Sequence, residues 1–325
     1  MMRRGRELLG PAIGLALVLG LFCALAPESF PTGENLRTLL LQAVLVAVGA
    51  VGMTFVIVSG GIDLSVGSVI ALASVVTALV TRAGGGDALA LLAGVATGAL
   101  AGMANGLLVG ALRITPFIAT LGTMGMARGL AKGLADERAV YPGSEDWSSM
   151  LMARAPDPPW LVLAPGVWIA IALALVAAFL LRRTVFGTWI YAVGSSEPTA
   201  RLCGVPVART KFSVYLLCGL CAGLAGALQF HRLGAGDPTT AMGKELDIVA
   251  AVVVGGAALA GGEGGIAGSM IGALLMAALA NGANLVEVPA LGIASIPGWV
   301  QEIAVGAIIV VAVWSDRRRR RAQPS

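Results

Sequence analysis

Long apolar runs, separated by short polar segments, recur along the whole chain. Most of them contain the roughly 20 residues that a helix needs to cross the hydrocarbon core of a bilayer. Ten runs cover residues 11–26, 36–58, 66–80, 89–112, 115–134, 160–181, 212–230, 246–260, 266–285 and 298–314. This pattern predicts an all-α polytopic membrane protein with about ten transmembrane helices. The third and eighth runs are short and lie next to glycines, so each is open to being a broken or re-entrant helix.

Composition agrees with a membrane protein that forms a single transmembrane domain over residues 1–325. Hydrophobic residues make up 57% of the chain, charged residues make up only 12%, and the mean hydropathy is +0.88. A soluble domain is about 25% charged and less apolar. These values exclude a disordered chain, a collagen-like repeat and almost any soluble enzyme of this length.

Basic residues predict the orientation of the helices. With ten crossings both termini lie on one side, and that side carries 14 of the 22 Lys and Arg residues. They are Arg3, Arg4, Arg6, Arg113, Arg182, Arg183, Arg201, Arg209, Lys211, Arg317, Arg318, Arg319, Arg320 and Arg321. Because cytoplasmic loops are enriched in Lys and Arg, both termini and the 182–211 segment are predicted to be cytoplasmic, with the 135–159 loop outside. The first run also resembles a signal peptide, but this charge balance favours a retained helix.

Glycines in the fourth run repeat at strict four-residue steps. They are Gly94, Gly98, Gly102, Gly106 and Gly110. One face of this helix therefore lacks side chains over five turns, so another backbone can approach it closely. Helix packing is the favoured interpretation, and a substrate path lined by backbone is the alternative.

Four polar side chains fall within or between apolar runs, where placing a polar group at membrane depth costs free energy unless it has a polar partner. Asp63 follows the helix-breaking pair Gly60-Gly61, where it or Ser65 can cap the next helix; a role in a substrate path or gate is the alternative. Asn105, Asn281 and Asn284 lie inside apolar runs. Such amides either bond across helices or face a hydrated path, and the sequence does not decide between the two.

The chain lacks the motifs of nucleotide and metal chemistry. No Gly-x-x-x-x-Gly-Lys-Ser/Thr sequence occurs, so the chain has no P-loop of its own. His231 is the only histidine, and the four cysteines form no metal-ligand or disulfide pattern. We therefore expect no bound metal and no cofactor.

The 182–211 segment contains a predicted short helix at residues 198–203. Glu197 can cap it, Pro198 suits its first turn, and Gly204 can end it. A helix this short is unstable alone in water. It needs a surface to lie on, which is either the chain's own inner face or a second protein.

Five motifs, in order along the chain, resemble those of the ribose/xylose/arabinose-type permeases of ATP-binding-cassette (ABC) importers. They are Gly-Ile-Asp-Leu-Ser-Val-Gly-Ser at 61–68, Pro-Phe-Ile-Ala-Thr-Leu-Gly-Thr-Met at 116–124, the 187–204 loop, Glu-Leu-Asp-Ile-Val-Ala-Ala-Val-Val-Val-Gly-Gly at 245–256 and Asn-Gly-Ala-Asn-Leu at 281–285. The chain departs from the family's coupling loop at Pro198 and Thr199, which replace usual residues.

The resemblance implies a permease subunit without an enzymatic site, in the bacterial inner membrane. It implies a cytoplasmic ATPase that uses ATP and Mg, a periplasmic or tethered sugar-binding protein, and a second permease subunit, either a homodimer partner or a close paralogue. Membrane lipid is expected around the chain, and nucleic acid is not a partner. Candidates for the substrate path or gate are Asp63, Asn105, Thr120, Asn281 and Asn284. Candidates for the ATPase-coupling helix are Ser196, Glu197, Arg201 and Gly204.

Two functions are alternatives to an ABC permease. A secondary transporter or facilitator acting alone would suit broken helices, but the chain shows no clear internal repeat and few embedded ionisable groups. An intramembrane serine hydrolase would need His231 near Ser59 or Ser65, whereas the predicted topology separates them by about 30 Å, one hydrocarbon thickness. Among substrates, nucleosides and other small polar solutes remain open beside the sugars.

Overall fold

The computed structural model describes residues 2–142, 147–154, 156, 161–286 and 295–321, and within this part it is built from helices. The β-type pairing found there is one isolated bridge, between Val140 and Gly236. The elements in chain order are α1 (Met2–Leu25), α2 (Gly33–Val58), α3 (Val66–Arg82), α4 (Asp87–Gly106), η1 (Leu107–Ala111), α5 (Pro116–Leu134), η2 (Trp147–Met152), α6 (Pro165–Arg183), α7 (Val185–Ser195), α8 (Glu197–Leu202), α9 (Val207–Leu233), α10 (Lys244–Val254), α11 (Ile266–Leu285) and α12 (Gly298–Arg321).

Six of the described helices are long and apolar enough to cross a membrane. They are the segments Leu8–Leu25, Gly33–Val58, Asp87–Ala111, Pro165–Arg183, Val207–Leu233 and Ile266–Leu285. Two shorter apolar helical segments, Val66–Arg82 and Gly298–Val311, accompany them. The chain is thus an all-helical, multi-pass membrane protein. The count of ten crossings stays a prediction.

The eighth apolar run is only partly helical. The sequence predicts residues 246–260 as a short run that is open to being a broken or re-entrant helix, and α10 ends within it at Val254. Glycines with positive φ angles follow it, with Gly256 at 96° and Gly261 at 86°. Such backbone is favourable mainly for glycine. The helical part of the run is therefore shorter than a bilayer crossing, and the irregular segment 255–265 continues it to the end of α2, where the backbone N of Gly262 donates to the carbonyl oxygen of Val58 at 2.9 Å.

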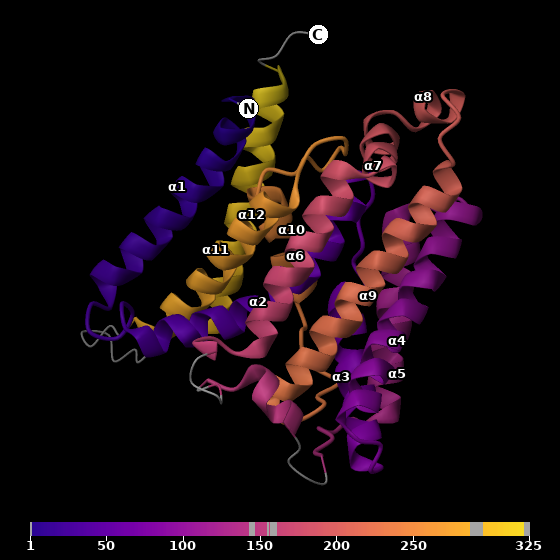
Figure 1. Cartoon of the computed structure of the whole chain (residues 1–325). Helices are drawn as coiled ribbons and strands as arrows, with labels where there is room; N and C mark the ends of the chain where they lie inside the picture. Colours follow the sequence, from indigo (N-terminus) through magenta and orange to yellow (C-terminus); the bar gives the residue numbers. More distant parts are fainter. Residues whose placement is uncertain (1, 143–146, 155, 157–160, 287–294, 322–325) are drawn as a thin grey trace.

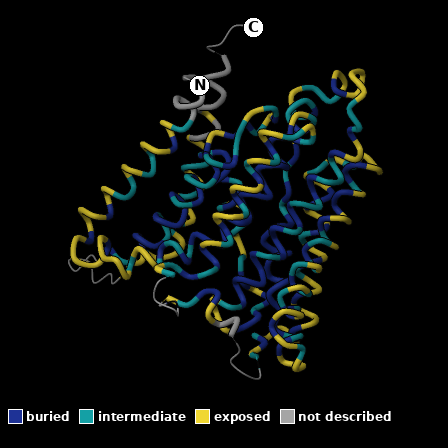
Figure 2. The backbone as a smooth tube through the Cα atoms, in the orientation of Figure 1, coloured by how far each residue is buried: buried dark blue, intermediate teal, exposed yellow. Residues whose placement is uncertain are grey.

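The core lies along α2, and 94% of its apolar window is buried. This helix packs against α6, α9, α10 and α11, and α9 in turn packs against α3 and α4. Buried residues fill the middle of the bundle, whereas α1 is exposed along most of its length (Figure 2). A helix apolar on all sides is expected in such a central position.

The glycine ladder of α4 lies against α9 of the same chain. A β-carbon at Gly102 would lie 2.5 Å from the carbonyl oxygen of Tyr215, and one at Gly106 would lie 2.8 Å from that of Phe212. The ladder meets the glycines Gly219 and Gly223 of α9, so the two backbones are in direct contact. Small residues permit this closeness, which supplies the dispersion contacts that hold helices together in lipid.

The two ends of the bundle are distinct (Figure 1). The beginning of α1, the end of α12 and the short helix α8 lie at one end, called here the α8 end. The beginning of α2 and the end of α11 lie at the opposite end. Part of the 135–159 loop and residue 160, where the sixth run was predicted to begin, lie outside the described residues.

Candidate functional site

Asp63 lies in the linker 59–65, where the chain leaves α2 and enters α3. The helix ends at Val58, and Gly60 follows it with a φ of 82° that suits glycine. The carboxylate of Asp63 is 2% exposed, and its Oδ1 accepts hydrogen bonds from the backbone N of Ser65 at 2.9 Å and from the Ser65 hydroxyl at 2.6 Å. Polar partners within the protein thus compensate for a carboxylate at membrane depth.

Asn105 of α4 connects this linker to α5. Its Nδ2 donates to the Ser65 hydroxyl at 2.9 Å and to Asp63 Oδ2 at 3.3 Å, and its Oδ1 accepts from the Thr123 hydroxyl at 2.5 Å. Thr120, one turn earlier on α5, donates to the carbonyl oxygens of Pro116 at 2.9 Å and Ile62 at 3.4 Å. We call Asp63, Ser65, Asn105, Thr120 and Thr123 the buried network.

The buried network corrects the capping prediction. Ser65 stands at the N-cap of α3 but its side chain caps no amide of that helix, and Asp63 bonds the amide of Ser65 rather than one in the first turn. Three of the five predicted path or gate residues meet here, all nearly inaccessible. Thr123 was missed, although its three-residue spacing from Thr120 places both on one face of α5.

The other two path candidates lie elsewhere, at the opposite end of the bundle. Asn281 and Asn284 of α11 line a pocket of about 310 Å³ between α11 and the beginning of α2, called here the α2–α11 pocket. Asn281 is 4% exposed, and its Oδ1 has no partner among the described residues. Asn284 is exposed, and its Oδ1 accepts a hydrogen bond from Gln301 Nε2 of α12 at 3.0 Å.

The predicted coupling helix is α8, and its cap differs from the expectation. Ser196, not Glu197, is the N-cap: its hydroxyl accepts from the backbone N of Thr199 at 3.4 Å and shares a hydrogen bond with the Thr199 hydroxyl at 2.8 Å. Ser is a better N-cap than Glu because its short side chain reaches back to the free amides. Gly204, with a φ of 80°, follows the end of the helix.

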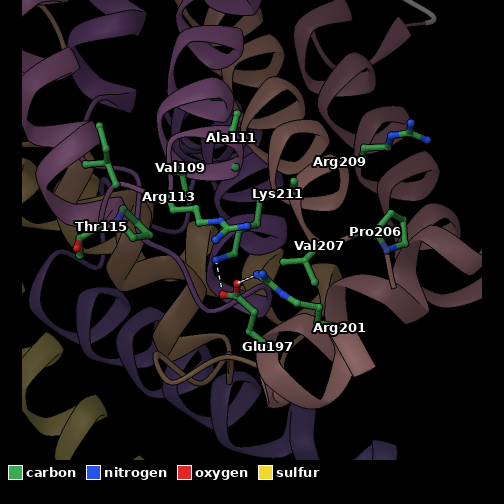
Figure 3. A pocket seen from close by; sticks show the side chains of 14 residues that line it. Val109, Ala111, Arg113, Thr115, Glu197, Arg201, Pro206, Val207, Arg209 and Lys211 are labelled. Atoms are coloured by element: carbon green, nitrogen blue, oxygen red, sulfur yellow. Dashed lines mark hydrogen bonds and ion pairs between the residues drawn. The ribbon is translucent and has the colours of Figure 1, made fainter. Parts of the chain in front are cut away.

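Glu197 instead attaches α8 to α9. Its carboxylate pairs with Arg201 at 2.8 Å, four residues later, and with Lys211 of α9 at 2.6 Å (Figure 3). The hydrogen bond from Lys211 is the main reason that the pKa of the Glu197 carboxyl is below its usual range. The sequence pattern did not single out Lys211 for this segment, because an ion pair between residues 14 apart in the chain depends on tertiary structure.

The exposed face of α8 carries an unpartnered apolar side chain. Leu202 is 90% exposed, on a helix whose Ala200 is buried against the bundle. Beside α8 lies a pocket of about 550 Å³, lined among others by Arg113, Arg201, Arg209 and Lys211, with Glu197 as its one carboxylate (Figure 3). This end of the molecule thus presents an exposed apolar side chain next to a pocket lined mainly by basic residues among its charged ones.

The structure gives no support to hydrolase chemistry. The hydroxyl of Ser59 donates to the carbonyl of Val56 and that of Ser65 to Asp63, so neither is directed to His231. Within the described residues, no three His, Cys, Asp or Glu side chains gather in a way that could hold a metal ion.

Comparisons with known proteins place this geometry in context. Residues 35–313 match the family described as the branched-chain amino acid transport system / permease component. The chain is 39% identical to the ribose import permease protein RbsC of Escherichia coli strain K12 over 95% of its own length and 93% of the relative's. It is 39% identical to the protein of the same name from Bacillus subtilis strain 168, over 96% of this chain and 93% of the relative. The L-arabinose transport system permease protein AraH of E. coli K12 is 36% identical to the chain, over 94% of this chain and 89% of the relative. No solved structure matches the chain.

Proposed function

The chain belongs to the family of transport-system permease components that includes the ribose and arabinose permeases, and from this premise we propose that it is the membrane subunit of an ABC importer for a monosaccharide. Its curated relatives are named for ribose, L-arabinose and D-allose. The substrate of this chain is a pentose or hexose of that kind. The chain forms one permease domain over residues 1–325, and it has no catalytic site of its own.

The proposed topology has ten crossings with both termini and α8 in the cytoplasm of a bacterial inner membrane. Two features support it. The beginning of α1, the end of α12 and α8 share one end of the bundle (Figure 1). The 14 basic residues of the predicted inner side lie in these elements, in the last turn of α6, in the first turns of α9 and in the 107–115 segment. A second permease subunit completes the assembly.

The observation that carries the proposal is α8. A six-residue helix is unstable in isolation, yet here it is capped by Ser196, held to α9 by Glu197, and presents a 90% exposed leucine. A surface of this kind suits a protein partner, because a few residues buried at the centre of an interface contribute most of its binding energy. The partner is the cytoplasmic ATPase, which binds ATP and Mg; a sugar-binding protein delivers substrate at the opposite end.

The path candidates take two roles in this proposal. The buried network joins the 59–65 linker to α4 and α5, so Asp63, Asn105 and Thr120 act as a gate whose hydrogen bonds must rearrange when the permease changes conformation. Asn281 and Asn284 lie at the end that receives the sugar.

Reconstitution tests the proposal. The permease is placed in proteoliposomes with a matching ATPase and sugar-binding protein, and uptake of radiolabelled D-ribose, L-arabinose and D-allose is measured. We expect uptake of at least one sugar that requires ATP and all three components. The variant Leu202→Asp should abolish uptake while insertion persists. Uptake that is independent of ATP in the complete system would overturn the proposal.

A secondary transporter is the alternative function. The observation that favours it is the pair of interrupted segments, the 59–65 linker and the half-length α10 with its glycine turn, because broken helices are common in such transporters. Uptake by the permease alone, driven by a proton or sodium gradient, would establish it.

A further inference from the structure

Most of the residues that line the α2–α11 pocket have polar side chains. Eight of its nine lining residues carry polar side chains: Thr32, Glu34, Asn35, Thr38, Gln42, Arg154, Asn281 and Asn284. The ninth is Leu285. Its volume of about 310 Å³ is at the lower end of the range of small-molecule sites, about 300 to 1,000 Å³. Polar groups in such a site fix the orientation of the ligand, so these side chains suit a small hydrophilic molecule.

The polar faces are regular features of the two helices. On α2, Glu34, Thr38 and Gln42 follow one another at four-residue steps and therefore share one face. On α11, Asn281 and Asn284 are three residues apart and share the facing side. Gln42 lies nine residues into its helix, or about 13 Å from the first residue. Polar residues are common in the terminal turns of a helix, but this polar stripe extends past those turns into the middle of α2.

Two amides in this pocket lack partners within the described chain. The Oδ1 of Asn281 is buried without a hydrogen bond, in a residue that is 4% exposed. Gln42 is partly buried and makes no side-chain hydrogen bond to a described residue. A buried polar atom without a partner costs about 1 to 3 kcal/mol, so such atoms usually have a ligand or a bound water.

The charge of the lining points to a neutral ligand. Glu34 and Arg154 are the formally charged residues of the pocket, and their charges cancel. An amide offers both donors and an acceptor, which matches a hydroxyl that both donates and accepts. A polyhydroxylated neutral molecule therefore fits this lining better than an anion or a cation.

We propose that the α2–α11 pocket is a sugar-binding site at the outer mouth of the permease, in which Asn281 and Gln42 bind substrate hydroxyls. This inference rests on the proposed function for the identity of the ligand. It goes beyond that function by giving the permease its own recognition site, which receives the sugar released by the binding protein. Asn284 bonds to Gln301 at the rim and holds α12 beside the site.

The test measures direct binding of sugar to the permease. Saturation-transfer NMR is recorded on the full chain in lipid nanodiscs with D-ribose, L-arabinose and D-allose in turn. We expect a transfer signal for at least one sugar, reduced at least tenfold in Asn281→Leu and in Gln42→Leu. Leucine has the same number and branching of side-chain heavy atoms as asparagine, so the first variant removes the amide while keeping the branched shape.

A matched control separates binding from folding. The hydroxyl of Ser74 in α3 is also buried without a partner, but Ser74 does not line this pocket. Ser74→Ala should keep the full transfer signal. Asn281→Leu should melt at the wild-type temperature or higher, because it removes an unpaired buried group.

The coupled system gives a second measurement. In complete proteoliposomes, Asn281→Leu should hydrolyse at least ten times more ATP per sugar transported, because the binding protein still stimulates hydrolysis while capture of the sugar fails. A purely structural defect would reduce hydrolysis and transport together. Absence of a transfer signal for all three sugars, or an unchanged signal in both leucine variants, would overturn the inference. A pocket-dependent signal without ATP-driven uptake would instead support the site and refute the ABC function.

Discussion

The contact between the glycine ladder of α4 and α9 makes a quantitative prediction for Gly102→Ala. The new β-carbon would lie 2.5 Å from the carbonyl oxygen of Tyr215 and 2.9 Å from the Cα of Gly219, whereas ordinary contact begins at 3.4 Å. Both neighbours are backbone atoms, which cannot move aside as the end of a side chain can. The helices must therefore separate by roughly 1 Å or bend, as in other overpacked cores.

The expected cost is a loss of about 1 to 3 kcal/mol of stability, the usual range for overpacking. Alanine is a better helix former than glycine by about 0.8 to 1.0 kcal/mol, and this gain offsets only part of the loss. The measurement is thermal unfolding of the purified full chain in detergent, followed by size-exclusion chromatography of the remaining folded protein.

Gly20→Ala in α1 is the matched control. A β-carbon at Gly20 would meet no atom within 4 Å, so this variant keeps the propensity gain without the clash. We expect its melting temperature to equal or exceed that of the wild type, while Gly102→Ala melts several degrees lower. Equal melting temperatures for the two variants would show that α4 and α9 are not in backbone contact and would refute the packing argument.

Three further predictions address the other sites. Asn105→Leu should destabilise the folded chain by about 1 to 3 kcal/mol in the same assay, because Asp63 and Thr123 lose a hydrogen-bond partner. Thr97→Val is the control: it loses only a hydrogen bond to Ala93 of its own helix, so it should have a smaller effect. Lys211→Met should release α8 from α9 and reduce coupled uptake several-fold, with Lys132→Met as a charge-matched control; normal uptake in Lys211→Met would remove the ion pair from the coupling role. In the folded chain the pKa of the Glu197 carboxyl is below its ordinary value of 4.5. The ion pairs of Glu197 therefore stabilise the fold above pH 4.5, and this contribution is lost as the pH falls through the folded pKa. Protection of the α7–α9 segment against protease should thus persist from pH 7 to 5, and release of α8 at pH 6 would contradict this reasoning.

The helical fold follows from the sequence because apolar runs and glycine steps are local signals. The glycine ladder indicated a close helix neighbour, but its identity as α9 depends on tertiary packing. Residues 219 and 223 repeat the same four-residue step, which is the one signal that could have paired them. The glycines beside the run 246–260 indicated that it could be a broken helix, but the residue at which α10 ends was less predictable, since the run remains apolar through its glycine turn.

The candidate sites were only partly predictable from the sequence. Asp63 and Asn105 are conspicuous because they are polar in apolar surroundings, yet their hydrogen bonds join residues about 40 apart in the chain. Gln42 was not predicted as a site residue because a lone glutamine in a long apolar run indicates no partner until α2 and α11 are placed side by side. Leu202 was overlooked because a leucine in an apolar-rich chain carries no signal until its exposure is known.

The backbone contact between α4 and α9 has a mechanical consequence. Around Gly98 and Gly102 the nearest atoms of α9 all belong to its backbone, so no rotamer change there can absorb a displacement of one helix against the other. A force applied at α8 and passed to α9 through Glu197 and Lys211 must therefore turn both helices as a single stiff body. Bending is then confined to segments such as 59–65 and 255–265, whose glycines tolerate large changes of dihedral angle.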